Sequence, residues 1–445
     1  MKLPPKPPTL DELFNDSDVV KAVNRILSDG SGPEANGKYY HWEKLIHLEP
    51  PKNLTHRQWW FGLKYSRRQI AKGIPLRDTD DGAFSYAMTD GVLRLVHRVD
   101  RDASGRIEIS EQVTNRETRD RYIVHSLIQE AITSSQLEGA STTVEQAKEM
   151  LRTGRKPVDR SERMIFNNFL AMRHVRQFTD QPLTPELVLE LQEIVTRDTL
   201  DDSRAGGRFR TSSDDIVVSD SLTGRVLHRP PPAEDLEKRV VLMCDFANDR
   251  SEDEFVHPVV RAIILHFWLG YDHPFVDGNG RTARALFYWS MLSQGYWLAE
   301  YVSISRILRA APAKYARSFL YTETDENDLT YFILYQLRVI ERAIDELHRY
   351  LQKKVAEVRQ IERLIRKSAE LNHRQLALLS HALKHPDARY TIESHRSSHN
   401  VVYQTARMDL LDLEDNGVLE KRKMGRTYYF SPVRNLADRL RNLDE

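Results

Sequence analysis

The sequence predicts a mainly α-helical protein with one isolated β-hairpin in its central part and a helix–helix–hairpin unit near its C-terminal end. Apolar residues recur at helical spacing over residues 121–137, 281–294 and 329–367. No proline or glycine interrupts residues 281–294. The β-prone runs are short and flank glycine-containing turns, which is typical of hairpins and not of a large sheet.

Composition limits the class of protein. A chain of 445 residues can form two or three domains with buried cores. Because 65 basic residues balance 65 acidic ones, no global field attracts nucleic acid or membrane, and any polyanion site must be local. A single cysteine, Cys244, excludes internal disulfides and favours a reducing compartment. The start lacks the apolar core of a signal peptide, and the strongest apolar run, residues 262–270, is too short to span a bilayer. We therefore expect a cytoplasmic protein without membrane contact.

The N-terminal part is expected to contain two segments. Residues 1–36 begin with a flexible, proline-rich lead and continue as a short helix from Thr9 to Leu27. Residues 37–155 form a helical region that opens with an aromatic-rich stretch. Its Trp59-Trp60-Phe61 sequence indicates core packing and not a platform for stacking bases.

The central helical core is expected over residues 156–325, and one hairpin interrupts it. Two short β-prone arms flank a turn that contains Gly224, and three prolines follow at 230–232. A lone hairpin among helices is marginally stable, so it either has a use or is a plain surface loop. The arms contain Ile216, Val217, Val218, Val226 and Leu227.

A connecting amphipathic helix is predicted over residues 326–370. One apolar seam runs along it with charged residues elsewhere, which favours either a homodimer surface or packing within the monomer. The seam consists of Leu334, Leu337, Ile340, Ile344, Leu347 and Leu351.

The C-terminal part, residues 371–445, resembles a winged helix-turn-helix domain. Helices are predicted over 371–384 and 398–415, a short element over 390–394, and a hairpin with a basic tip over 418–430. Such a domain places its second helix in the DNA major groove and its wing on phosphate. It can equally bind protein or serve a structural role. Val401, Met408, Leu411 and Leu413 are expected to pack inward, and the candidate DNA contacts are Tyr403, Gln404, Arg407, Lys421, Arg422, Lys423 and Arg426.

The most informative feature is a twelve-residue run from His273 to Arg284. Gly278, Asn279 and Gly280 lie where a loop becomes a predicted helix, and such a start leaves backbone N–H groups free to face an anion. Arg281 and Arg284 are spaced i, i+3, so both guanidiniums project from one face and can bind phosphate oxygens. The run therefore predicts a site for two or three phosphates.

His273 and Asp277 add chemistry to this site. A lone carboxylate at Asp277 would repel a polyphosphate unless a divalent ion lay between them, which indicates a Mg²⁺ ligand. His273 has the only side chain of the run that can take a proton from a hydroxyl near neutral pH, so it is the candidate general base. Singly, such residues are typical of turns and solvated helix faces, but together they indicate a functional site.

The run resembles the signature of the Fic domain family, His-x-Phe-x-(Asp/Glu)-Gly-Asn-Gly-Arg-x-x-Arg, at every fixed position. The resemblance implies a helical enzyme, typically an adenylyltransferase that moves AMP from ATP to a Ser, Thr or Tyr hydroxyl of a target protein. It also implies that His273 deprotonates that hydroxyl, Asp277 holds Mg²⁺ and Arg284 binds the γ-phosphate. Residues 278–281 would bind the other phosphates, Phe275 would anchor the loop, and the hairpin would be the flap that holds a target segment by strand addition.

A second motif precedes the core. Residues 134–139 resemble the (Ser/Thr)-x-x-x-Glu-(Gly/Asn) inhibitory helix of the same family, with Ser134, Glu138 and Gly139 at the matching positions, at the end of the segment 121–139. A Glu138 carboxylate that reached Arg284 would occupy the guanidinium that the γ-phosphate needs. The structural alternative is an ordinary helix end with an exposed glutamate.

The sequence therefore predicts a Mg²⁺-dependent protein adenylyltransferase that Glu138 holds inactive. Two alternatives stay open. An intact Glu138 can also orient a water and support removal of AMP, and the sequence does not fix the direction of the reaction. In the other alternative the chain is a DNA-binding transcriptional regulator whose Fic domain senses a nucleotide. No motif identifies the target protein.

Overall fold

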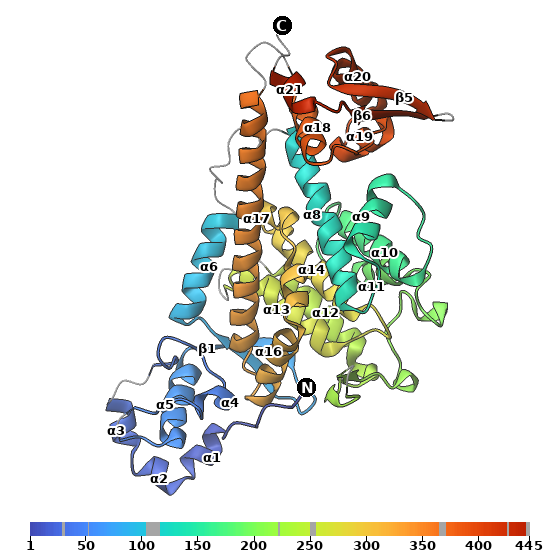
Figure 1. The fold of residues 1–445 in the computed structure, drawn as a ribbon. Coiled ribbons are helices and arrows are strands. Elements are labelled where there is room, and N and C mark those ends of the chain that lie inside the picture. Colours follow the sequence, from blue (N-terminus) through green and yellow to red (C-terminus); the bar gives the residue numbers. More distant parts are fainter. Residues whose placement is uncertain are drawn as a thin grey trace. The chain divides into compact units, whose positions relative to one another are not determined.

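The computed structural model describes residues 1–28, 32–51, 53–103, 116–220, 223–249, 255–364, 371–424 and 427–441. Helices dominate these residues, and the strands form three separate two-stranded sheets within them, so the predicted mainly α-helical fold is confirmed (Figure 1). The chain divides into two compact units. The first contains residues 1–106, 130–141 and 159–343, and the second contains residues 107–129, 142–158 and 344–445.

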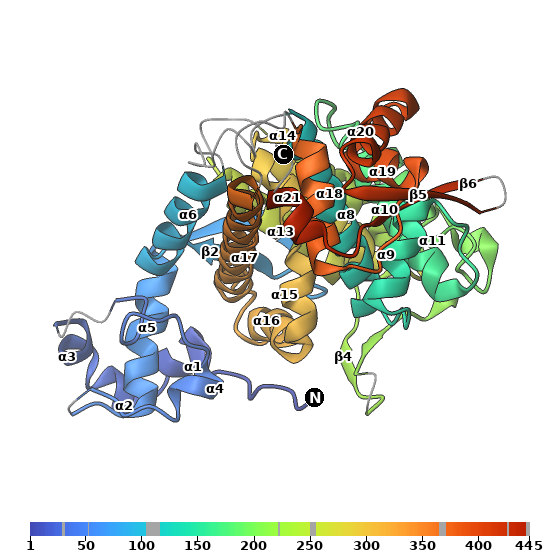
Figure 2. The ribbon, with the colours of Figure 1, turned by 45° about the horizontal axis from the view of Figure 1, so that its top comes forward.

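The N-terminal residues form a cluster of short helices around one longer helix (Figures 1 and 2). The single helix expected over Thr9–Leu27 is wrong, because the Asp16 side chain accepts hydrogen bonds from the backbone of residues 18 and 19 and starts a new helix. Trp59-Trp60-Phe61 is buried in the core of this cluster, as expected. The helices are α1 (Leu10–Phe14), α2 (Ser17–Val20), α3 (Val23–Ser28), α4 (Trp42–Leu45) and α5 (His56–Gln69).

A β-hairpin that the sequence analysis did not anticipate follows these helices. Strands β1 (Ala71–Arg77) and β2 (Ala83–Ala87) pair antiparallel. The turn between them is closed by the Asp78 carboxylate, which accepts hydrogen bonds from the backbone N–H of Asp80 at 2.9 Å and of Gly82 at 2.6 Å. Helix α6 (Asp90–Ala103) completes this part of the first unit.

Two helices lie in the middle of the first unit, α13 (Pro258–Asp272) and α14 (Asn279–Ser293) (Figure 1). Nearly every residue of α13 is buried, which explains its continuous apolar sequence. The loop between these helices contains the His273 motif. The surrounding elements are α8 (Arg116–Leu137), whose last residues belong to this unit, α10 (Arg160–Val175), α11 (Pro185–Thr196), η1 (Ser203–Ala205), η2 (Ser212–Asp214), β3 (Val218–Ser219), β4 (Val226–His228), η3 (Ala233–Asp235), α12 (Leu236–Asn248), η4 (Trp297–Tyr301), α15 (Ile304–Ala310), α16 (Pro312–Thr324) and the first turns of α17 (Thr330–Leu364).

The second unit contains a helical cluster closed by a hairpin. The helix expected over 398–415 is shorter, because Asn400 adopts a left-handed backbone with φ 52° and separates α19 from α20. The inward position expected for Met408 is wrong, since Met408 is exposed and Ala406, Leu410 and Leu413 face the core. The elements are α9 (Val144–Thr153), α18 (His373–Lys384), α19 (Ile392–His399), α20 (Tyr403–Asp415), β5 (Leu419–Met424), β6 (Thr427–Pro432) and α21 (Leu436–Arg441).

In the part of the chain that the structure describes, no helix combines the length and the apolar character needed to cross a membrane.

Candidate functional site

The loop between α13 and α14 has a fixed shape. His273 ends α13 with a left-handed backbone, φ 45°, and Gly278 starts α14 with φ 88°. The Asn279 side chain accepts a hydrogen bond from the Phe275 backbone N–H at 2.9 Å and donates one to the Phe275 carbonyl at 2.8 Å. Phe275 itself is fully buried. The amide of Asn279 therefore fixes the shape of the loop.

Glycine is required at two positions because other groups lie against the backbone. A Cβ on Gly278 would lie 2.7 Å from Thr196 Cγ2 on α11. A Cβ on Gly280 would lie 2.1 Å from Glu138 Oε1 and 3.0 Å from Arg284 Nη1. The Glu138 carboxylate of the upstream motif and the Arg284 guanidinium of the loop motif therefore both lie next to the Gly280 backbone.

Arg284 is bound by the end of α8. Its Nη2 donates to Glu138 Oε1 at 2.9 Å and to the Ser134 carbonyl at 3.1 Å, and its Nε donates to Ser134 Oγ at 2.8 Å. Burial alone would lower the pKa of Arg284, but Glu138 and other negative groups raise it above its ordinary value. Arg284 is 1% exposed, and its Nη1 has no hydrogen-bond partner among the described residues. Gly139 ends the helix with φ 96°.

Arg281 is hydrogen-bonded both to α11 and to the loop. Its Nη1 donates to the Val195 carbonyl at 2.6 Å and its Nη2 to Asp277 Oδ1 at 3.3 Å, while its Nε has no partner among the described residues. Burial lowers the pKa of Arg281. The Asp277 side chain is 39% exposed, so its carboxylate borders solvent at the mouth of the site.

His273 has the properties of a base at neutral pH. Burial lowers its pKa to about 4, so the imidazole is neutral under ordinary conditions. Its Nδ1 lies 3.3 Å from the Gly270 carbonyl, which can only accept a hydrogen bond, so Nδ1 carries the proton. Nε2 is then the nitrogen able to receive a proton.

Two residues that the sequence analysis did not select hold this loop from outside. Arg210 Nε donates to the His273 carbonyl at 2.9 Å, and the Arg210 N–H donates to the Pro274 carbonyl at 2.9 Å. Gln192 Nε2 donates to the Asp277 carbonyl at 3.0 Å. No local signal points to Gln192. Arg210 belongs to Gly207-Arg208-Phe209-Arg210, a stretch just before the hairpin that resembles Fic family sequence.

The predicted hairpin forms, with shorter strands than expected, and its role as a flap stays a prediction. Val218 pairs with His228 and Ser219 with Val226, while Ile216 and Val217 precede the strand. Leu227 is half-buried, and Ser221 and Leu222 lie outside the described residues. His228 fixes the base of the hairpin, since its Nδ1 lies 2.7 Å from Glu323 Oε2 and its Nε2 lies 2.7 Å from the Tyr271 carbonyl.

The candidate DNA contacts lie in the second unit. Tyr403, Gln404 and Arg407 are exposed on α20. Two of the basic wing residues are paired with acids within the same unit, Lys421 with Glu414 at 2.9 Å and Arg422 with Glu420 at 2.9 Å. Lys423 lies over the ring of Tyr428, and Arg426 lies outside the described residues. DNA binding by this part stays a prediction.

Comparison with known proteins agrees with the motif. Residues 182–291 match the model of the Fic/DOC family. Over 139 residues, 31% of this chain, the sequence is 33% identical to the protein adenylyltransferase Fic of Nematostella vectensis, and over 202 residues, 44% of this chain, it is 30% identical to that of Drosophila mojavensis. The chain spans only 28% and 37% of the length of these relatives.

Among solved structures, a Fic family protein from Desulfovibrio desulfuricans superposes with a TM-score of 0.49 at 19% identity, over 79% of this chain and 98% of that one. The Fic-1 protein of C. elegans gives a TM-score of 0.47 at 20% identity, over 78% of this chain and 90% of that one. The match to the Fic/DOC family model therefore covers residues 182–291, which include the complete motif between His273 and Arg284.

Proposed function

We propose that the chain is a protein adenylyltransferase, which transfers AMP from ATP to a Ser, Thr or Tyr hydroxyl of a target protein. The single observation that carries the proposal is the buried guanidinium of Arg284, which lies next to the Gly280 backbone of the loop that also carries the neutral His273. Burying a cation with an unpartnered N–H costs free energy unless an anion accepts a hydrogen bond from that N–H. The names of the two curated relatives support the same activity.

The start of α14 supplies the phosphate site. Its first backbone N–H groups point forward, the helix dipole favours negative charge there, and Gly280 lets a phosphate approach the backbone closely. Arg284 adds a multidentate donor for the terminal phosphate. The Arg281 guanidinium, which is hydrogen-bonded to the Val195 carbonyl on α11, adds a second positive charge next to the same loop.

Asp277 is the residue that would hold Mg²⁺. Among the described residues no group of three His, Cys, Asp or Glu side chains converges on one point, so a site formed by protein ligands alone is not supported there. A partly exposed carboxylate at the mouth of a phosphate site fits an ion that is bound by one acid and by substrate oxygens. When bound, Mg²⁺ would neutralise phosphate charge.

The transfer step follows from the position of His273. Its Nε2 accepts the proton of the target hydroxyl, and the hydroxyl oxygen then forms a bond to the α-phosphorus of ATP. The bond between the α-phosphorus and the bridging oxygen breaks, and pyrophosphate leaves. The flap would align the target segment by strand addition, so that one hydroxyl lies next to His273.

Glu138 would control this reaction by competition. Its carboxylate occupies Arg284 Nη2 and lies directly over Gly280, so the terminal phosphate and the Glu138 side chain require the same space and the same donor. ATP then either fails to bind or binds with its α-phosphate displaced from the attacking oxygen. Ser134, which also binds Arg284, would keep the guanidinium in place when Glu138 moves away.

Labelled AMP incorporation tests the proposal. The wild type, Glu138→Gly and Glu138→Gly/His273→Ala proteins are incubated with ATP labelled at the α-phosphate, MgCl₂ and a cell lysate. We expect strong protein labelling by Glu138→Gly alone. Equal labelling by wild type and Glu138→Gly would contradict control by Glu138, and undiminished labelling after His273→Ala would contradict the proposed chemistry.

A further inference from the structure

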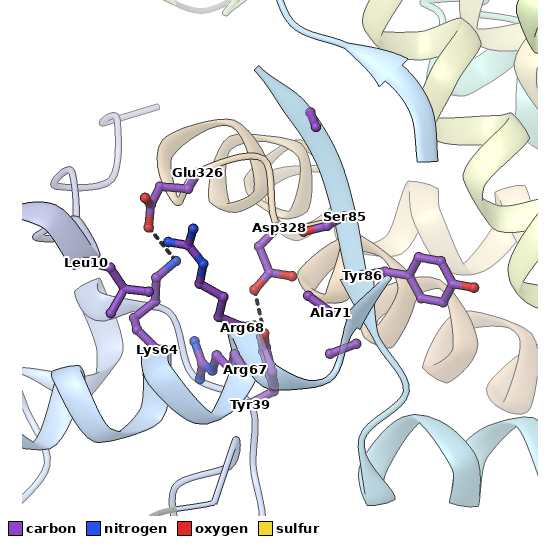
Figure 3. Close-up of a pocket in the computed structure, with 12 residues that line it drawn as sticks. Leu10, Tyr39, Lys64, Arg67, Arg68, Ala71, Ser85, Tyr86, Glu326 and Asp328 are labelled. Atoms are coloured by element: carbon purple, nitrogen blue, oxygen red, sulfur yellow. Dashed lines mark hydrogen bonds and ion pairs between the residues drawn. The ribbon is translucent and has the colours of Figure 1, made fainter. Parts of the chain in front are cut away.

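Two cavities adjoin the N-terminal helices of the first unit, and they differ in charge. The first, of about 350 Å³, is bordered by α5, the β1–β2 hairpin and the segment before α17 (Figure 3). Most of its charges are paired inside the protein: Lys64 Nζ lies 2.8 Å from Asp325 Oδ1 and 2.9 Å from Glu326 Oε2, and Tyr39 donates to Asp328 at 2.5 Å. This cavity therefore offers few free groups to a ligand.

The second cavity, of about 490 Å³, lies where the Tyr39–Leu45 segment meets α16 and the first turns of α17. Its volume is in the range of small-molecule sites. Partly exposed tyrosine rings form much of its wall, namely Tyr40, Tyr321 and Tyr335. Tyr321 stacks on the His41 ring at 4.2 Å, which fixes its orientation. The wall can therefore pack against a planar ring.

The border of this cavity is positively charged. Lys44, Lys314 and Arg338 line it and are exposed, and none of them has a hydrogen-bond or ion-pair partner among the described residues. Glu43 is the one acidic residue in the described lining. Arg317 Nη1 balances its charge at 2.8 Å, and the Tyr321 hydroxyl donates a hydrogen bond to it at 2.6 Å. Three unbalanced positive charges around one cavity stand out in a chain with a net charge of zero.

The cavity is separate from the Arg284 site. On α16, Lys314, Arg317 and Tyr321 are spaced i, i+3, i+7 and share the face that lines the cavity. Tyr315 lies on another face, where its hydroxyl is 2.8 Å from His266 Nε2. A negative charge on Tyr315 would interact with Arg284, so that face adjoins the buried guanidinium. The helix therefore lies between the two sites.

We propose that this cavity is a second nucleotide site, which binds a nucleoside phosphate through its ring and its phosphate at once. The tyrosines would stack on the base, and Lys314 and Arg338 would bind the phosphate as charge-assisted donors. A metal cation does not fit the charge of the border, and a free phosphate would leave the aromatic wall unused. The inference does not depend on the adenylyltransferase reaction, because it uses none of the residues of the α13–α14 loop.

Equilibrium binding of AMP, GMP and UMP, each measured separately by calorimetry at low salt, tests this site. In the Arg284→Ala protein, which lacks the phosphate donor of the loop, we expect at least one nucleotide to bind within twofold of its wild-type affinity. Adding Lys314→Ala and Arg338→Ala should weaken that binding at least tenfold. Lys238→Ala, an exposed lysine on α12, is the matched control and should change nothing.

Variants of Tyr335 test whether the aromatic wall binds the nucleotide base, separately from the contacts to the phosphate. Tyr335→Leu should weaken nucleotide binding at least tenfold and Tyr335→Phe should not, and adenosine or inorganic phosphate alone should bind at least tenfold more weakly than AMP. Circular dichroism of each variant checks its fold. The proposal is overturned if Arg284→Ala abolishes nucleotide binding, if the Lys314→Ala/Arg338→Ala pair leaves it unchanged, or if none of the three nucleotides binds to the wild type.

Discussion

Replacing Glu138 by glutamine should tighten ATP binding to the α13–α14 loop by roughly 5- to 10-fold. The Glu138 carboxylate forms a 2.9 Å charge-assisted hydrogen bond with Arg284, and ATP must break this bond to reach the guanidinium. Glutamine keeps the shape of the side chain but forms a neutral hydrogen bond, which is weaker than one between charged groups by about 1–1.5 kcal/mol. About 1.4 kcal/mol corresponds to a tenfold change in affinity. Since the Glu138 side chain is 32% exposed, screening by water favours the lower half of this range.

Glycine at the same position should increase affinity at least as much as glutamine, because it also removes the atoms that lie over Gly280. Glu138 follows the last residue of α8, so neither substitution interrupts that helix. The assay is calorimetric titration with ATP and MgCl₂ at fixed low salt. Glu237→Gln, an exposed glutamate on α12, is the control.

The coupling between the two residues can be measured directly. In an Arg284→Ala background, Glu138→Gln should give no further gain, because the group for which it competes is gone. The reasoning is refuted if Glu138→Gln and Glu138→Gly both bind ATP within twofold of wild type while remaining folded.

Four further predictions concern other parts of the structure. His273 should titrate by NMR with a pKa of about 4. Because its pKa in the unfolded state is near 6.5, the stability that it contributes should be complete above pH 6.5 and should decrease as pH falls toward 4. An NMR midpoint at 6.5 or higher would contradict this. Gly280→Ala in the Glu138→Gly background should weaken ATP binding about tenfold, since a methyl group would fill the phosphate site, and unchanged calorimetric affinity would show that no phosphate lies there. Asp409→Ala should lower the free energy of unfolding in urea by about 3–5 kcal/mol, because it removes the buried acceptor that joins α18, α19 and α20, and an unshifted transition would exclude that role. If the wing binds DNA, Lys423→Ala should reduce the slope of the logarithm of the binding constant against the logarithm of the salt concentration by about one, as measured by mobility shift. A wild-type protein without salt-dependent binding would rule the hypothesis out.

The arrangement of the loop could be predicted because its residues lie close together in the sequence. The residues from His273 to Arg284 occupy one loop and one helical turn, so local rules for helix starts place them correctly. The supports of the loop were not predictable. Gln192 reaches the Asp277 carbonyl across 85 residues and Arg210 reaches the His273 carbonyl across 63, and neither side chain carries a local signal of that contact.

Errors in the predicted helices have a common cause, which is competition from polar side chains. Asp16 caps a new helix inside a run that otherwise keeps helical spacing, and Asn400 tolerates the left-handed backbone that separates α19 from α20. A single helix across that break predicts an inward Met408, but α20 begins its own register at Tyr403 and leaves Met408 exposed. The β1–β2 hairpin was overlooked although Asp81-Gly82 is a turn signal, because Pro75 within β1 weakens the strand pattern.

The central claim is tested most directly by determining which phosphate of ATP becomes covalently attached to protein. Glu138→Gly protein is incubated with a lysate, MgCl₂ and ATP that carries the label at either the α- or the γ-phosphate. The account predicts that only the α-label is incorporated into protein, that one pyrophosphate is released for each AMP, and that His273→Ala prevents both. Incorporation of the γ-label without the α-label would show that the site transfers a different group and would contradict the account.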